Sequence, residues 1–118
     1  MVRLISCGLN HGAPPAASLV IDCRDLPDPS GVVLGMPGID PEVGAVIVGL
    51  NPLAVSWVEL AGQLVLEKAA ADPDVVVVFC CNAGMHRSVF VAEEVAALVE
   101  EAGVEACVIH RDLGMEDL

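Results

Sequence analysis

The stretch from Asp74 to Cys80 constrains the fold more than any other part of the chain. Its sequence is Asp-Val-Val-Val-Val-Phe-Cys, so after the aspartate no polar side chain interrupts a run of β-branched and aromatic residues. A strand that is apolar on both faces is typical of the centre of a parallel sheet with helices on both sides. The chain is therefore predicted to fold around this strand as a layered α/β domain.

Three further short runs are predicted to be strands, and the segments between the strands have the apolar spacing of helices. The other strands are expected at residues 2–7, 17–22 and 105–109. The helices are expected at 41–49, where Asp40 is the N-cap, at 53–68, and at 87–102, which Gly103 ends. This order predicts one domain, residues 1–118, with a small open, mostly parallel sheet of about four strands and helices on both faces.

The charge balance argues against several classes of function. The 118 residues include 17 Asp plus Glu and five Lys plus Arg, which gives a net charge of −12. Only 3% of the residues are aromatic, whereas a nucleic-acid binder needs a basic face with aromatic platforms, so direct RNA or DNA binding is not expected. The longest apolar runs fall well short of the roughly 18–20 residues of a membrane span. No secretory signal is evident, which favours the cytoplasm.

The most specific motif leaves the central strand and enters the helix after it. Residues 81–88 read Cys-Asn-Ala-Gly-Met-His-Arg-Ser and fit C-x-x-G-x-x-R-[ST], the loop of cysteine-dependent phosphatases. Five residues between Cys81 and Arg87 allow successive N–H groups to turn inward, and Gly84 permits a φ that other residues resist. The helix adds its positive N-terminal end, and Ser88 can bond the Cys81 sulfur or cap the helix. The loop is predicted to bind a tetrahedral anion, which Arg87 would grip with two hydrogen bonds.

Two other interpretations of this loop remain open. Cys81 could be the nucleophile of a phosphatase, with Arg87 as the clamp, because a thiol at a helix N-terminus beside a cation ionises readily. That chemistry needs a general acid, which Asp22 or Asp25 could supply only if their strand neighbours the central strand. Alternatively the loop is an ordinary strand-to-helix turn, with Cys81 buried and Arg87 paired to a carboxylate.

The few cations occur where an anion site would use them. Arg24, Arg87 and Arg111 each follow a predicted strand, and the carboxyl ends of parallel strands share the sheet edge at which ligands bind. His11 lies in a Gly-Pro loop, and His86 precedes Arg87. The five cysteines lack metal-site spacing, so most are expected to be packing residues, and neither a metal nor a cofactor is predicted.

Six blocks of the sequence, in order, resemble the C-terminal domain of the RapZ family of RNase adapter proteins. The blocks are Gly8-Leu9-Asn10-His11-Gly12 with Pro14, Asp22 to Pro29, Gly38-Ile39-Asp40 with Val43, Cys81 to Ser88, Val89 to Glu93, and His110-Arg111-Asp112. The resemblance covers residues from about 5 to 113, nearly the whole chain. The His86-Arg87-Ser88 core is not usual in phosphatases, which makes the match specific.

The resemblance implies a phosphosugar sensor, because the C-terminal domain of that family binds glucosamine 6-phosphate. The ligand-binding set that follows is Cys81, Asn82, Ala83, Gly84, Met85, His86, Arg87 and Ser88 around the phosphate, with His11, Arg24 and Arg111 lining the pocket. The family's N-terminal nucleotide-binding domain and the basic tail of its RNA-binding members have no counterpart in this sequence. The expected role is a regulatory domain that binds a small phosphorylated metabolite, and a homo-oligomer or a protein partner would fit that role.

Overall fold

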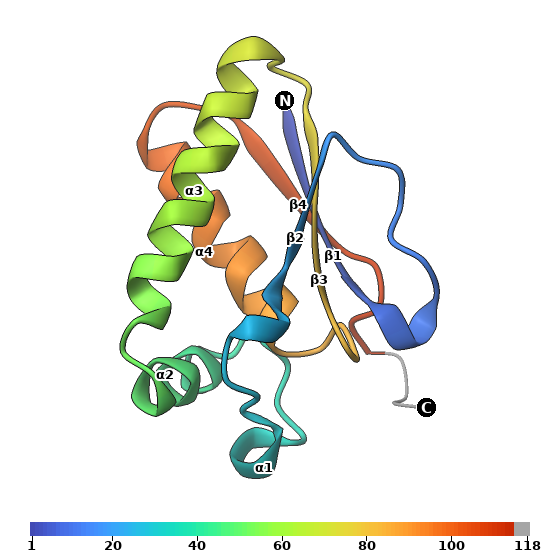
Figure 1. Ribbon diagram of the computed structural model, residues 1–118, viewed down its shortest axis with the longest axis vertical. Coiled ribbons are helices and arrows are strands. Elements are labelled where there is room, and N and C mark those ends of the chain that lie inside the picture. The colour runs from blue at the N-terminus through green and yellow to red at the C-terminus, as the bar shows by residue number, and fades with distance from the viewer. Residues whose placement is uncertain (115–118) are drawn as a thin grey trace.

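A four-stranded, all-parallel sheet forms the centre of the computed structural model, which describes residues 1–114 (Figure 1). The strands are β1 (Val2–Gly8), β2 (Leu19–Asp22), β3 (Val76–Cys81) and β4 (Ala106–His110). Their order in the sheet is β2-β3-β1-β4. The α/β class and the parallel sheet are thus confirmed, and the predicted central strand is one of the two inner strands.

The helices occupy the predicted segments, with small shifts at their ends. The long helices are α2 (Pro41–Leu50), α3 (Ala54–Ala71) and α4 (Arg87–Glu101), and the short ones are η1 (Leu9–His11), η2 (Cys23–Asp25) and α1 (Ser30–Val33). Asp40 caps α2 by accepting the N–H of Glu42 at 2.9 Å. After α4 the chain turns at Gly103, whose φ is 86°. Both of these helix signals therefore act as the sequence predicted.

Helices α3 and α4 lie on the same face of the sheet, which differs from the expected cover on both faces (Figure 1). The reason is that connections between parallel strands are almost always right-handed. In the order β2-β3-β1-β4, the steps from β2 to β3 and from β3 to β4 run in the same direction. The step from β1 to β2 runs the other way, so residues 9–18 pass over the opposite face.

The hydrophobic core is one-sided for the same reason. Val77 and Phe79 point to the helix face and are fully buried against α3 and α4. The opposite face has a small buried cluster that comprises Cys7, Val78 and Cys80. Val20, which pairs with Val78 in the sheet register, remains 49% exposed. The apolar residues of β3 are therefore buried on both faces of the sheet. On one face they pack against helices, and on the other only against a small cluster.

The cysteines serve as packing residues, as predicted. All five are free thiols; Cys107 is partly buried, and the other four are buried. Burial raises the pKa of the Cys7 thiol to about 11 and also raises the pKa of Cys23. These two thiols therefore stay protonated at neutral pH.

The chain bends by 113° between α2 and α3. Within residues 1–114 no single helix is long and apolar enough to span a membrane, although this bent pair reaches that length and composition together. The bend leaves α2 below the carboxyl ends of the strands, while α3 runs back along the sheet (Figure 1). The elements near the carboxyl end of the sheet are α2, η1, η2 and the loop that follows β3 (Figure 1).

A pair of identical substitutions tests the one-sided core. We expect Val77→Ala to lower the free energy of unfolding by about 2–3 kcal/mol, because it leaves a cavity under α3 and α4. Val20→Ala on the neighbouring strand should cost no more than about 0.5 kcal/mol, since that side chain is half exposed. Urea unfolding of both variants measures the difference, and equal losses would contradict the arrangement.

Candidate functional site

The loop between β3 and α4 curls back over the end of β1. Gly84 takes a φ of 73°, as the motif predicted. A Cβ on Gly8 would overlap the backbone carbonyl of Ala83, and the N–H of Asn10 donates to the carbonyl of Asn82 at 2.9 Å. Two backbones therefore meet with no side chain between them, and this contact fixes the shape of the loop.

A second segment supports the loop from the other side. The N–H of Gly38, in the stretch before α2, donates to the carbonyl of Met85 at 2.7 Å. A Cβ on Gly38 would overlap the carbonyl of His86, so glycine is needed for this close approach as well. The importance of Gly38 was not predicted, although it lies in one of the blocks that carry the family resemblance.

The backbone donors of the loop have no acceptor in the described part of the chain. Among residues 1–114, the N–H groups of residues 83–88 make no hydrogen bond to the protein. His86 is the N-cap of α4 but makes no side-chain cap, and its Nε2 atom is buried without a partner. Free N–H groups at a helix N-terminus are the usual donor set for a bound anion.

Arg87 is buried beside these donors and is 7% exposed. Its Nη1 atom donates to the carbonyls of Arg24 and Leu26 at 3.0 and 3.1 Å, which holds the guanidinium group against η2. The bonds found among residues 1–114 use Nη1 alone, so Nε and Nη2 remain available to a ligand. No carboxylate pairs with Arg87 in that range, in contrast to the interpretation of the loop as an ordinary turn.

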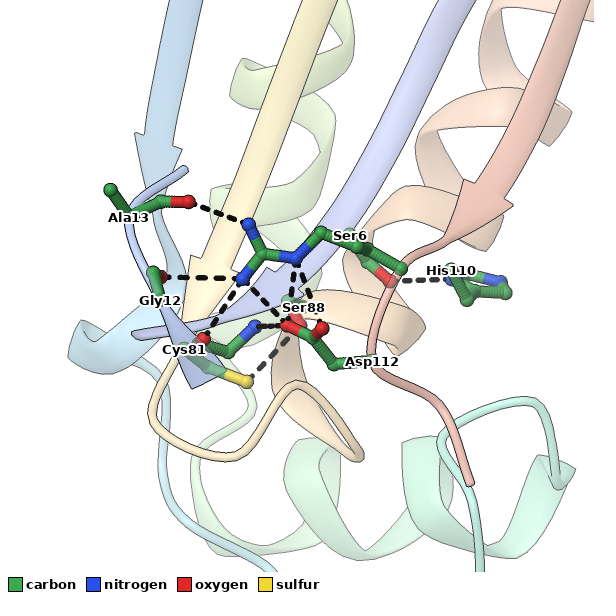
Figure 2. Close-up of polar contacts among 9 residues, drawn as sticks. Ser6, Gly12, Ala13, Cys81, Ser88, His110 and Asp112 are labelled. Atoms are coloured by element: carbon green, nitrogen blue, oxygen red, sulfur yellow. Dashed lines mark hydrogen bonds and ion pairs between the residues drawn. The ribbon is translucent and has the colours of Figure 1, made fainter. Parts of the chain in front are cut away.

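Cys81 ends β3 and is 2% exposed. Its Sγ atom lies 3.1 Å from the Oγ atom of the fully buried Ser88 (Figure 2). Of the two roles predicted for Ser88, the structure therefore shows the bond to the sulfur. The burial of Cys81 is the one feature of the ordinary-turn interpretation that the structure shows.

Arg24 lies at the same sheet edge, but its guanidinium group is engaged with Asp22. The Nη2 atom of Arg24 is 2.8 Å from the Oδ2 atom of Asp22, and both side chains are about half exposed. Hydrogen bonds from Arg24 lower the pKa of Asp22. Because β2 neighbours β3, the condition set for Asp22 as a general acid is met, yet the carboxyl group is ionised at neutral pH.

Arg111 is also engaged within the protein. Its guanidinium group bonds the carboxylate of Asp112 and the carbonyls of Gly8, Gly12 and Ala13 (Figure 2). Asp112 is 3% exposed and accepts the N–H of Gly8 at 2.7 Å. Burial raises the pKa of Asp112, but the bonds from Arg111 and Gly8 outweigh it and the net shift is downward. This cluster joins the end of β4 to the loop after β1.

Two further side chains border the site. His11, in η1, has a buried Nε2 atom without a partner among the described residues. Asp28 lies in one of the blocks that carry the family resemblance but was not predicted as a site residue. It lies close enough to Arg87 and His86 for their charges to lower its pKa. Burial alone would raise the pKa of Asp28, but those charges and the hydrogen bonds from Ser30 prevail. The site therefore contains a negative group as well as positive ones.

His110 connects three elements beside the site. Its Nδ1 atom is 2.6 Å from the Oγ atom of Ser6 in β1, and its Nε2 atom is 2.7 Å from the Oε1 atom of Glu93 in α4. Ser6 is fully buried, which denies a substrate access to its hydroxyl group. We therefore interpret this chain of bonds as a structural link between β1, β4 and α4.

Comparisons with known proteins agree with this arrangement. The family model described as the RapZ C-terminal domain matches residues 1–114. A nucleotide-binding protein of Thermobifida fusca is 35% identical over 97% of this chain and 41% of its own length. The nucleotide-binding proteins of Streptomyces coelicolor and Erythrobacter litoralis are 35% and 36% identical, over 96% and 95% of this chain. The chain spans about two fifths of the length of these relatives.

The Asp112 cluster gives a pH-dependent prediction. The pKa of Asp112 is lowered in the folded state, so its contribution to stability is present at neutral pH and is lost as the pH falls through that folded pKa. We expect Asp112→Asn to lower the free energy of unfolding by about 1–3 kcal/mol at neutral pH. The deficit should begin to shrink below about pH 4, where the carboxyl group of the unfolded chain protonates, and continue to shrink toward the lower pKa of the folded state.

Denaturant unfolding at several pH values measures this deficit. Glu67→Gln on the exposed side of α3 is the matched control and should be close to neutral throughout. A deficit that is the same at pH 3 and pH 7 would show that the ionised carboxylate is not what stabilises the cluster.

Proposed function

Because this chain belongs to the RapZ C-terminal domain family, we propose that it is a binding domain for a small phosphorylated metabolite, with the phosphate held on the loop from Cys81 to Ser88. The observation that carries the proposal is the set of unpaired backbone donors at residues 83–88. These N–H groups and the positive end of α4 suit a dianion, which a phosphate monoester supplies. Arg87 adds a charged donor that is already fixed in position.

The rest of the ligand would extend from the loop toward η1 and η2. His11 borders one side, and Asp28 borders the other, near Arg87 and His86. A carboxylate beside a phosphate site favours a ligand that carries an amine as well as a phosphate. We therefore favour an amino-sugar phosphate, such as glucosamine 6-phosphate, over a neutral sugar phosphate.

The charge of the whole chain restricts the ligand further. A net charge of −12 surrounds a locally positive site, so large polyanions are repelled while a small anion can enter. The relatives are named nucleotide-binding proteins, and a nucleotide presents the same phosphate chemistry. Nucleotides are therefore the necessary comparison in a binding test. A sensor of a metabolite pool in the cytoplasm is the role that fits these features.

Calorimetry with glucosamine 6-phosphate, glucose 6-phosphate, AMP and inorganic phosphate tests the proposal. We expect Arg87→Lys to weaken binding of the amino-sugar phosphate at least about tenfold, because lysine cannot make the planar, two-bond contact. Arg3→Lys, at the opposite end of β1, is the control with the same chemical change and should bind as wild type does.

Two further measurements keep this test decisive. A melting curve shows whether Arg87→Lys is folded, and if it is not, His86→Gln replaces it, since the Nε2 atom of that histidine has no partner to lose. Equal binding by the wild type and by a folded site variant would remove the loop as the phosphate site. Tighter binding of AMP than of glucosamine 6-phosphate would support the loop as the phosphate site but would make a nucleotide, and not an amino-sugar phosphate, the ligand.

Hydrolysis by Cys81 is the second candidate function, because Ser88 is placed to donate a hydrogen bond to a thiolate. Burial of the sulfur and the lowered pKa of Asp22, which removes a proton donor, support binding without turnover. We expect no hydrolysis of an aryl phosphate between about pH 5 and 8 above that of Cys81→Ser. Turnover that this variant abolishes would make the chain a cysteine-dependent phosphatase.

A further inference from the structure

A cleft in the described part of the chain lies between α2, α3 and α4 and reaches Gly38, the residue that supports the phosphate loop. It has a volume of about 530 Å³. Its floor is apolar and includes Ala45, Val48, Val55, Phe90 and Leu98. None of these residues belongs to the site proposed above, so this cleft calls for a separate explanation.

The geometry of the helices explains why the cleft exists. α2 approaches α4 closely through Gly44, where a Cβ would lie 2.7 Å from the Cε1 atom of Phe90. The 113° bend after α2 then carries α3 away at a steep angle, which leaves a wedge between the three helices. Apolar side chains line this wedge, and Val55 is 47% exposed there. The close approach at Gly44 and the bend after α2 therefore set the positions of the helices around the cleft.

The cleft continues along the seam between α3 and α4. A second depression of about 400 Å³ shares Glu59 and Leu98 with the first and runs on past Gly62 and Leu66. The two depressions therefore adjoin along α3 and α4, and an elongated occupant matches their combined extent better than a compact small molecule. An α-helix of about 10 Å diameter that lies on its apolar side is the common protein element of that shape.

Charge decides what kind of helix would fit. The first cleft is bordered by carboxylates and no lysine or arginine lines it. The acidic residues are Asp40, Glu59, Glu94 and Glu93, of which Glu93 also bonds His110. A second copy of the chain is a poor occupant, because its net charge of −12 would bring carboxylates against carboxylates. The complement of an apolar floor with an acidic border is an apolar stripe flanked by basic residues.

We propose that the cleft between α2, α3 and α4 docks an amphipathic helix of a protein partner, with aliphatic side chains on the floor and Lys or Arg facing the carboxylates. This interaction surface goes beyond the phosphate site and does not depend on it. Apolar contacts supply most of the affinity, and the charges set the orientation and the rate of association.

A synthetic helical peptide of about 16 residues tests the proposal, with Leu at positions i, i+3, i+4 and i+7 and Lys on the flanks. Fluorescence anisotropy of the labelled peptide measures its affinity for the full chain at low and physiological salt. We expect Glu94→Lys to weaken binding about fivefold at low salt. Glu100→Lys, the same change on α4 but outside the cleft, should stay within about twofold of wild type.

Two variants that each add a bulky side chain distinguish docking in the cleft from general attraction to an acidic protein. Ala45→Phe fills the floor at an exposed position of α2 and should weaken binding at least about tenfold. Ala97→Phe is the same change at an exposed position of α4 that does not line the cleft, and it should bind normally. Folding of both variants is checked by melting curves.

Three results would overturn the proposal. Equal weakening by Glu94→Lys and Glu100→Lys would show that only net charge attracts the peptide. Unchanged binding by a folded Ala45→Phe variant would show that the cleft is not the site. Self-association of the wild type in sedimentation, abolished by Ala45→Phe, would make a second copy of the chain the occupant.

Discussion

The whole site depends on one close approach of two backbones, where Gly8 at the end of β1 meets Ala83 and Gly84. With no side chain between them, the loop after β3 can rest on β1 and curl tightly. That curl is what turns the N–H groups of residues 83–88 away from acceptors in the protein. On the other side of the loop, Gly38 makes a second close backbone contact of this kind, with Met85 and His86. The loop is thus held by contacts between main-chain atoms.

Positive charge at the carboxyl edge of the sheet is less available than the number of arginines suggests. Arg24 is neutralised by Asp22, and Arg111 is occupied by Asp112 and by carbonyl groups. Among these three arginines, Arg87 is the one that no carboxylate of the described residues pairs with. The anion-binding character of the loop therefore rests on backbone dipoles and one guanidinium group. The use of a single arginine side chain is consistent with a chain whose net charge is −12.

Local patterns in the sequence were enough to predict the elements and the loop. The Asp40-Pro41 signal gave the start of α2, the run of valines gave β3, and Gly84 gave the positive φ. The sequence does not encode locally which residues meet across the fold. The one-sided helix layer follows from strand order, and the partners of Arg24 and Arg111 follow from where distant loops end. The cleft between three helices likewise depends on a bend that no short pattern reveals.

The position of β1 has a consequence for how the protein is made. β1 is synthesised before the other strands of this sheet, but both of its neighbours, β3 and β4, come from the second half of the sequence. Arg3 pairs with Val76, so more than 70 residues must emerge before β1 finds its first partner. At roughly 5–20 residues per second, the apolar strand waits several seconds on the ribosome unpaired. The sheet can therefore form only after β3 has been made, and a chain that stops before β3 contains neither a sheet nor a phosphate loop.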